Sequence, residues 1–101
     1  MTDRHILRFS FDGSVPAHEV ENTLLLAVLA AEGLHGPSRV RLETQYCFDA
    51  EKRTCVIDVG SEVGRDVSNI LAGFAIREFG EDAFTVCRAG AGPLEKEEVA
   101  A

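Results

Sequence analysis

The spacing of apolar residues constrains the fold of this chain more than any other feature of its sequence. It changes between a period of two, typical of a strand with one buried face, and a period near 3.6, typical of a helix with one buried side. Segments with a period of two are residues 5–11, 38–48, 54–59 and 83–88, and helical segments are residues 16–34 and 61–79. The sequence therefore predicts the order strand, helix, strand, strand, helix, strand.

This order favours an α+β fold in two layers. Each strand has one apolar face, and two helices suffice to cover one side of a four-stranded sheet. Right-handed crossovers then give the ferredoxin-like βαββαβ plan, with an antiparallel sheet in the order 4-1-3-2 and both helices on one face. We expect one domain over residues 1–90 and a flexible acidic C-terminal tail over residues 91–101, where periodicity is lost.

The charge of the chain limits its partners. The 17 acidic and 10 basic residues give a net charge of −7. Binding to phosphate backbones or anionic lipid depends on Lys and Arg, so a general nucleic-acid or membrane partner is not expected. The outward strand positions also lack the aromatic residues on which bases stack in RNA-recognition sheets.

The hydropathy of the chain bears on its location. The longest strongly apolar run is residues 24–31, much shorter than the ~20 residues that a membrane-spanning helix needs. Residues 1–11 alternate polar and apolar side chains instead of placing an apolar block after a basic segment, so they do not resemble a secretory signal. We expect a cytoplasmic protein.

The cysteines predict free thiols. Cys47, Cys55 and Cys87 are odd in number and form no CxxC pair, which argues against a disulfide framework, a zinc site and a redox motif. Because side chains alternate along strands, Cys47 belongs to an outward register and Cys55 to an inward one. The two thiols should therefore lie on opposite faces of the sheet.

The histidines do not indicate an enzyme. His5, His18 and His35 show no HxH or HExxH spacing, so a metal site is not expected and each is interpreted as a surface or loop residue. No base is placed beside a cysteine to activate it as a nucleophile. We predict no catalytic residues and no cofactor, and a small enzyme remains the third hypothesis.

The stretch from Asp58 to Leu71 has two interpretations. At the turn from the third strand into the second helix, Ser61, Gly64 and Arg65 could hold a small anion on unpaired backbone N–H groups. However, the stretch is neither GxGxxG nor a P-loop, and acidic residues surround it. The alternative is an ordinary helix start capped by Ser61.

Two glycines inside the second predicted helix need a separate reason. Gly64 and Gly73 each cost about 0.5–1 kcal/mol relative to Ala within a helix. Glycine at such a position usually indicates a close backbone approach. We therefore expect this helix to pack tightly on the sheet or on a neighbouring helix.

Two surfaces are candidates for protein contact. The first is the uncovered sheet face, where we expect Arg8, Arg39 and Arg41 to lie with Val56. The second is the first helix, whose apolar stripe is too broad for one buried side, since it also includes residues 25, 26, 28 and 29. The favoured function is a small non-catalytic protein-interaction or homo-oligomerising domain, and the alternative is a regulatory domain that binds a small anion at the turn.

Overall fold

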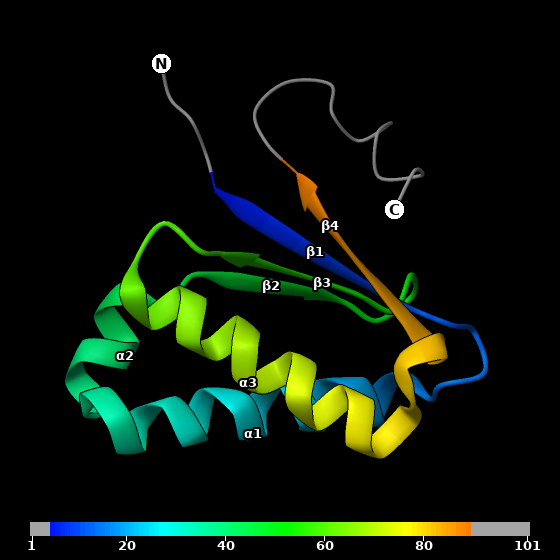
Figure 1. The fold of residues 1–101 in the computed structure, drawn as a ribbon, viewed down its shortest axis with the longest axis horizontal. Helices are drawn as coiled ribbons and strands as arrows, with labels where there is room; N and C mark the ends of the chain where they lie inside the picture. Colours follow the sequence, from blue (N-terminus) through cyan, green and yellow to red (C-terminus); the bar gives the residue numbers. More distant parts are fainter. Residues whose placement is uncertain (1–4, 90–101) are drawn as a thin grey trace.

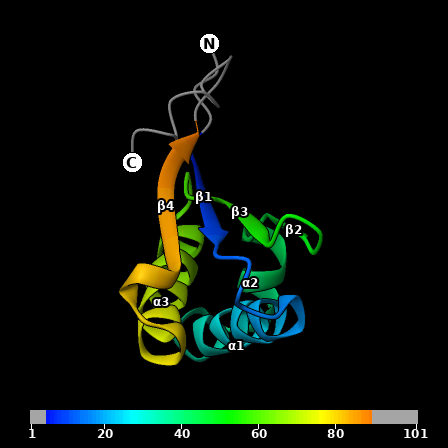
Figure 2. The ribbon, with the colours of Figure 1, turned by 90° about the vertical axis from the view of Figure 1, so that its right-hand side faces the viewer.

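The computed structural model describes residues 5–89, and the expected tail over 91–101 lies outside them. Its elements are β1 (Ile6–Phe11), α1 (Ala17–His35), α2 (Pro37–Glu43), β2 (Tyr46–Asp49), β3 (Thr54–Asp58), α3 (Glu62–Phe79), the 3₁₀ helix η1 (Glu81–Ala83) and β4 (Phe84–Ala89). The strands form one sheet, with α1 and α3 side by side against one of its faces (Figures 1 and 2). The protein is thus an α+β fold.

The sheet has the predicted topology. Its strands follow the order β2-β3-β1-β4, and every neighbouring pair is antiparallel. In the centre, Phe9 of β1 lies opposite Cys55 of β3 and Val86 of β4. The two-layer arrangement agrees with the ferredoxin-like plan except in its helices, because α2 is additional.

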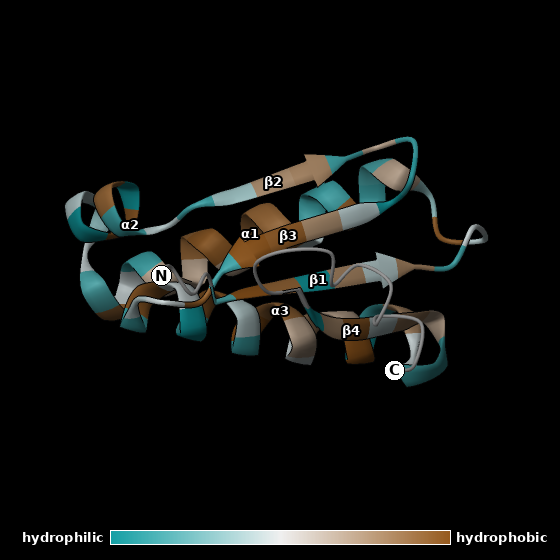
Figure 3. Cartoon of the chain, turned by 90° about the horizontal axis from the view of Figure 1, so that it is seen from above, coloured by the Kyte–Doolittle hydropathy of each residue, from teal (hydrophilic) through white to brown (hydrophobic). Residues whose placement is uncertain are grey.

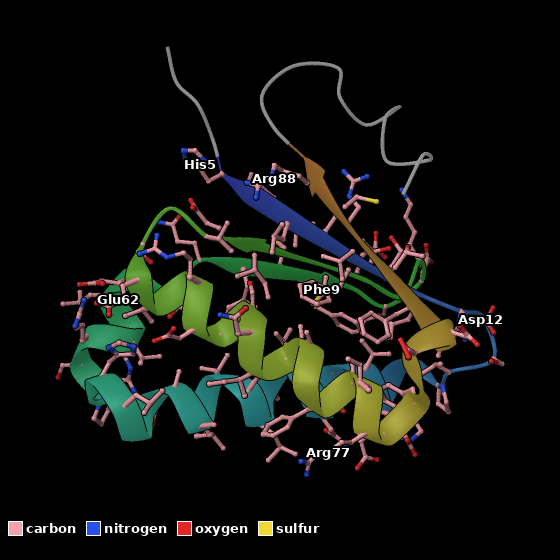
Figure 4. All side chains as sticks on the ribbon, viewed as in Figure 1. His5, Phe9, Asp12, Glu62, Arg77 and Arg88 are labelled. Atoms are coloured by element: carbon pink, nitrogen blue, oxygen red, sulfur yellow. The ribbon has the colours of Figure 1, made fainter. Side chains whose placement is uncertain are left out.

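The core lies between the sheet and the two long helices. Phe9 points into this space from β1 (Figure 4) and is 1% exposed. The predicted inward set of β3 and the predicted stripes of both helices are largely confirmed. The buried members are Cys55, Ile57 and Val59, then Val20, Leu24, Ala27 and Ala31 of α1, and Val63, Val67 and Leu71 of α3. Leu34, close to the C-terminal end of α1, is 66% exposed.

The predicted long strand over residues 38–48 is wrong. The segment divides into the helix α2 and the short strand β2. Pro37 occupies the first turn of α2, where its fixed φ and missing N–H are well tolerated. Only Val40 of α2 is buried, and one buried residue satisfies either period. The alternation of polar and apolar residues over 38–43 therefore did not distinguish a strand from a helix.

The ends of α1 lie within one residue of the predicted segment 16–34. The helix continues through Gly33 and ends at His35, where Gly36 adopts a φ of 88°. That left-handed conformation suits glycine, and Gly36 is followed at once by the start of α2. At the other end, Pro16 is the N-cap and no side chain caps the helix. The hydroxyl of Ser14 donates to Asp12 Oδ2 instead.

The edge strand β4 is only partly covered. Val86 lies opposite Phe9, on the helical side, and is 37% exposed because β4 has a neighbour on one side only. Among the described helices, none has both the length and the apolar character that crossing a membrane requires.

Candidate functional site

Ser61 acts as the predicted cap of α3. Its Oγ accepts a hydrogen bond from the backbone N–H of Gly64 at 3.0 Å. The same hydroxyl donates to the carbonyl oxygen of Glu43 at 3.2 Å, which joins the end of α2 to the start of α3. The one proton of Ser61 is therefore already used within the chain.

Gly64 explains the close approach of α3 to the sheet. The residue is buried, and a Cβ at this position would overlap the carbonyl oxygen of Asp58 at the end of β3. Nearby, the N–H of Gly60 donates to Asp58 Oδ1 at 2.8 Å. The prediction of a tight contact is confirmed for Gly64, and the contact is with the sheet.

Gly73 does not share this reason. It lies on an exposed part of α3, and a Cβ added to it would meet no atom within 4 Å. Within the described residues nothing approaches its backbone. The expectation of a close internal approach at Gly73 is wrong.

The structure brings Ser61 and Gly64 together but leaves Arg65 outside. Arg65 is exposed, and its exposed neighbour Glu62 is acidic. The groups of Ser61 and Gly64 that would face an anion instead bond to each other. The turn thus has the geometry of a helix cap, and anion binding remains a prediction that depends on Arg65.

His35 is part of a polar cluster that sequence reasoning missed. Its side chain is 8% exposed, so its interpretation as a surface residue is wrong. The imidazole Nε2 lies 2.7 Å from Asp66 Oδ2 of α3, and Nδ1 lies 3.4 Å from NH1 of Arg39. Because a guanidinium can only donate and a carboxylate can only accept, these contacts fit the tautomer that carries its proton on Nε2.

Arg39 completes this cluster. Its guanidinium donates to Glu43 Oε2 at 3.1 Å and to Glu62 Oε1 at 3.3 Å. Hydrogen bonding to Glu43, together with the nearby charges of Glu43 and Glu62, raises the pKa of Arg39. We call His35, Arg39, Glu43, Glu62 and Asp66 the α2–α3 corner. The spacing of four between Arg39 and Glu43 is a helical signal that identifies this pair once residues 37–43 are known to be helical.

The polar contacts of the corner connect helices to one another. An Asp–His pair can orient a general base, but that role needs the second ring nitrogen to face a substrate or nucleophile. Here Nδ1 of His35 faces a guanidinium that donates to it. The cluster therefore ties α1, α2 and α3 together.

The predicted grouping of Arg8, Arg39, Arg41 and Val56 is divided by the structure. Arg8 and Val56 lie opposite each other across β1 and β3, as expected. Arg39 and Arg41 lie on α2, away from the sheet face, so the expected basic strip is wrong. Seen from the open side of the sheet, hydrophobic and hydrophilic residues are mixed along the strands (Figure 3).

A hollow of about 790 Å³ lies over this face and the β2–β3 turn. Its lining includes Arg8 and Lys52 as well as Asp49 and Glu51. Cations and carboxylates are thus mixed around it, and no single sign of charge is available to select a ligand.

No disulfide joins the three cysteines, all of which lie within residues 5–89. Cys47 is exposed and lies opposite Val56 of β3. Cys55 is the residue next to Val56 along β3, so its side chain points to the other face, where it is buried in the core. The prediction that the two thiols lie on opposite faces is therefore confirmed. Burial raises the pKa of the Cys55 thiol to about 12. In the part of the chain that the structure describes, no group of three or more His, Cys, Asp or Glu is placed to hold a metal ion.

The outer surface of α1 carries several exposed leucines. Leu25, Leu26 and Leu29 are 42%, 55% and 58% exposed, and we call these three residues the leucine face. The prediction that α1 is apolar beyond one buried side is thereby confirmed. Of the extra residues, only Val28 packs against the core.

A groove of about 530 Å³ runs beside the leucine face, between α1 and α3. Leu26 and Phe74 form its apolar part. Arg77 belongs to its polar rim and projects away from the sheet (Figure 4). The polar lining residues are His18, Glu19, Asn22, Thr23, Arg77 and Glu78.

Comparison of the chain with models of known protein families, with curated proteins and with solved structures found no match.

Proposed function

We propose that this chain is a non-catalytic protein-interaction domain that contacts its partner through the outer side of its helix layer, centred on the leucine face. The exposure of Leu25, Leu26 and Leu29 is the observation that carries the proposal. We propose further that the domain follows the ferredoxin-like plan, with α2 as an additional helix. We also propose that it is located in the cytoplasm.

The energetic argument concerns apolar area. Fully burying a leucine side chain stabilises a protein or a complex by about 1.5–3 kcal/mol. Three leucines within five residues of one helix form a contiguous patch, and such patches on a soluble domain mark interaction sites. The groove beside them has an apolar part and a polar rim, which is the usual composition of a protein interface.

The other surfaces favour this role less. The sheet face mixes charges of both signs around its hollow, with Val56 as one of its apolar residues. The turn at Ser61 uses its hydroxyl in capping. Arg65 alone supports the alternative of a regulatory domain for small anions.

Site-specific photo-cross-linking in cells tests the proposal. A photoreactive amino acid replaces Leu26 in one variant and Glu51, an exposed residue of the β2–β3 turn, in the control. We expect light-dependent covalent adducts with protein from position 26 and few from position 51. Equal yields from both positions, or none from position 26, would contradict the proposed function.

A further inference from the structure

We infer that the partner of the leucine face is a second copy of this chain, whose α1 packs antiparallel against the first α1 about a twofold axis. This inference rests on the proposed function, since it names the occupant of the same surface. The axis crosses α1 at the level of the midpoint between Ala27 and Val28. This point is the centre of a strip of exposed residues formed by Asn22, Leu26, Leu29 and Gly33.

The spacing of the strip fits a twofold axis. Asn22, Leu26, Leu29 and Gly33 are all exposed and follow one another at intervals of four, three and four residues. Helical residues at these intervals lie on one side. The series is the same in both directions, so an antiparallel copy places Leu26 opposite Leu29 of the second copy, and Asn22 opposite Gly33. In a twofold interface every such contact is made twice.

The side chains in this strip also allow close packing. Its centre holds two large leucines, whereas Ala30 and Gly33 at its C-terminal end are small and exposed. Adding a Cβ to Gly33 would meet nothing within 4 Å. Gly33 costs helix stability without an internal reason. A helix from outside that approaches this surface closely supplies one.

The antiparallel direction agrees with electrostatics. In that arrangement the positive N-terminal end of each α1 lies near the negative C-terminal end of the other. Glu19 and Glu21 in the N-terminal part of α1 are exposed and remain at the rim. The centre of the strip carries no charge, which suits a desolvated contact.

The available area is sufficient for a dimer. The 19 residues of α1 extend for about 28 Å, and two helices side by side are about 20 Å wide. Their projected area is therefore about 560 Å². A stable complex buries about 600–1,000 Å² on each partner, and accessible area exceeds projected area because the surface is uneven. The interface can thus reach this size when the outer side of α3 joins α1 in the contact.

Sedimentation equilibrium of the full chain tests this pairing. We expect the wild type to be a dimer, and we expect Leu26→Glu and Leu29→Lys each to weaken dimerisation by at least about 30-fold, because each variant places its charge in the interface twice. Leu42→Glu on α2 is the matched control, since Leu42 is 81% exposed and lies off the strip. It should dimerise like the wild type.

Mixing the two variants tests the register. In the antiparallel pairing, the carboxylate introduced by Leu26→Glu in one chain faces the ammonium group introduced by Leu29→Lys in the other, and on the other side of the axis native leucines meet. Equimolar mixing should therefore restore a heterodimer that neither variant forms alone. Circular dichroism checks that every variant is folded, and the exposure of both leucines makes a fold defect unexpected.

The outcomes separate this inference from the proposed function. A wild type that stays monomeric up to about 1 mM overturns the second copy as partner. A dimer that both charged variants leave intact, or variants that do not recombine, overturn this pairing. If position 26 then still cross-links to a different protein, the proposed function stands without the dimer. If position 26 gives no adduct, the proposed function fails as well.

Discussion

The α2–α3 corner and the leucine face lie on the same helix layer. They differ in whether their side chains find partners within the chain. At the corner, His35 contacts both Asp66 and Arg39, which links three helices. On the leucine face, apolar side chains remain in contact with solvent. Polar residues at the corner thus serve the fold, whereas apolar residues on the outer surface of α1 are available to a partner.

This difference reverses the usual expectation from a sequence. Charged and hydroxyl residues near a glycine-rich turn suggest a ligand site, and a leucine-rich helix suggests core. Here the hydroxyl of Ser61 caps α3 and bonds to Glu43. Leu26 and Leu29, in contrast, are more than half exposed. Whether a side chain already has partners within the chain is therefore a better guide to function than its residue type.

The largest expected effect compares two glycines of α3. Gly64→Ala should lower the free energy of unfolding by about 3 kcal/mol, because its Cβ would overlap the Asp58 carbonyl and force the helix away from the sheet. Gly73→Ala, where the space is open, should raise it by about 0.5–1 kcal/mol. Urea denaturation of both variants measures the difference. Equal effects would mean that the close approach at Gly64 does not contribute to stability.

The next effect concerns the α2–α3 corner. His35→Ala should lower the free energy of unfolding by about 2 kcal/mol, since it removes a nearly buried imidazole that bonds to Asp66. His18→Ala is the control, because its side chain is 75% exposed and its loss should change stability by less than about 0.5 kcal/mol. Thermal unfolding followed by circular dichroism compares them. A His35→Ala variant as stable as the control would show that the corner does not hold the helices together.

The smallest effect distinguishes a cap from an anion site. Ser61→Ala should lower the free energy of unfolding by about 1 kcal/mol, and Arg65→Ala by less than about 0.5 kcal/mol. Phosphate should leave the Tm of the wild type unchanged, because Ser61 and Gly64 bond to each other. A rise in Tm with phosphate that is absent in Arg65→Ala would instead support the regulatory-domain alternative.

The sequence predicted most of the fold, and its errors have a common physical cause. Where several buried residues repeat at the helical spacing, the sequence predicts the element correctly, as with Val63, Val67 and Leu71 in α3. The segment at Pro37–Glu43 buries Val40 alone, and a single buried position fits a strand as well as a helix. That one error moved Arg39 and Arg41 to the wrong surface and hid the α2–α3 corner.

The candidate site was predicted in part. The cap at Ser61 and the close approach at Gly64 follow from local rules, because the first depends on neighbouring residues and the second on the cost of glycine in a helix. The contact of Ser61 with Glu43 joins residues 18 apart, and the bond between His35 and Asp66 joins residues 31 apart. No local rule links residues at such separations when the intervening element is assigned incorrectly.

Periodicity in the sequence determined the order of the main elements and the inward side of each long element, because burial of one face imposes a repeat that is visible along the chain. The strand order 4-1-3-2 then followed from right-handed crossovers between these elements. Which of the remaining apolar residues are covered was decided only by tertiary structure. The breadth of apolar residues on α1 was apparent from the sequence, but a helix has two sides that neighbours can cover. The packing of α3 and the sheet buries Leu24 and leaves Leu26 and Leu29 in solvent, since one sheet face can cover only one side of each helix.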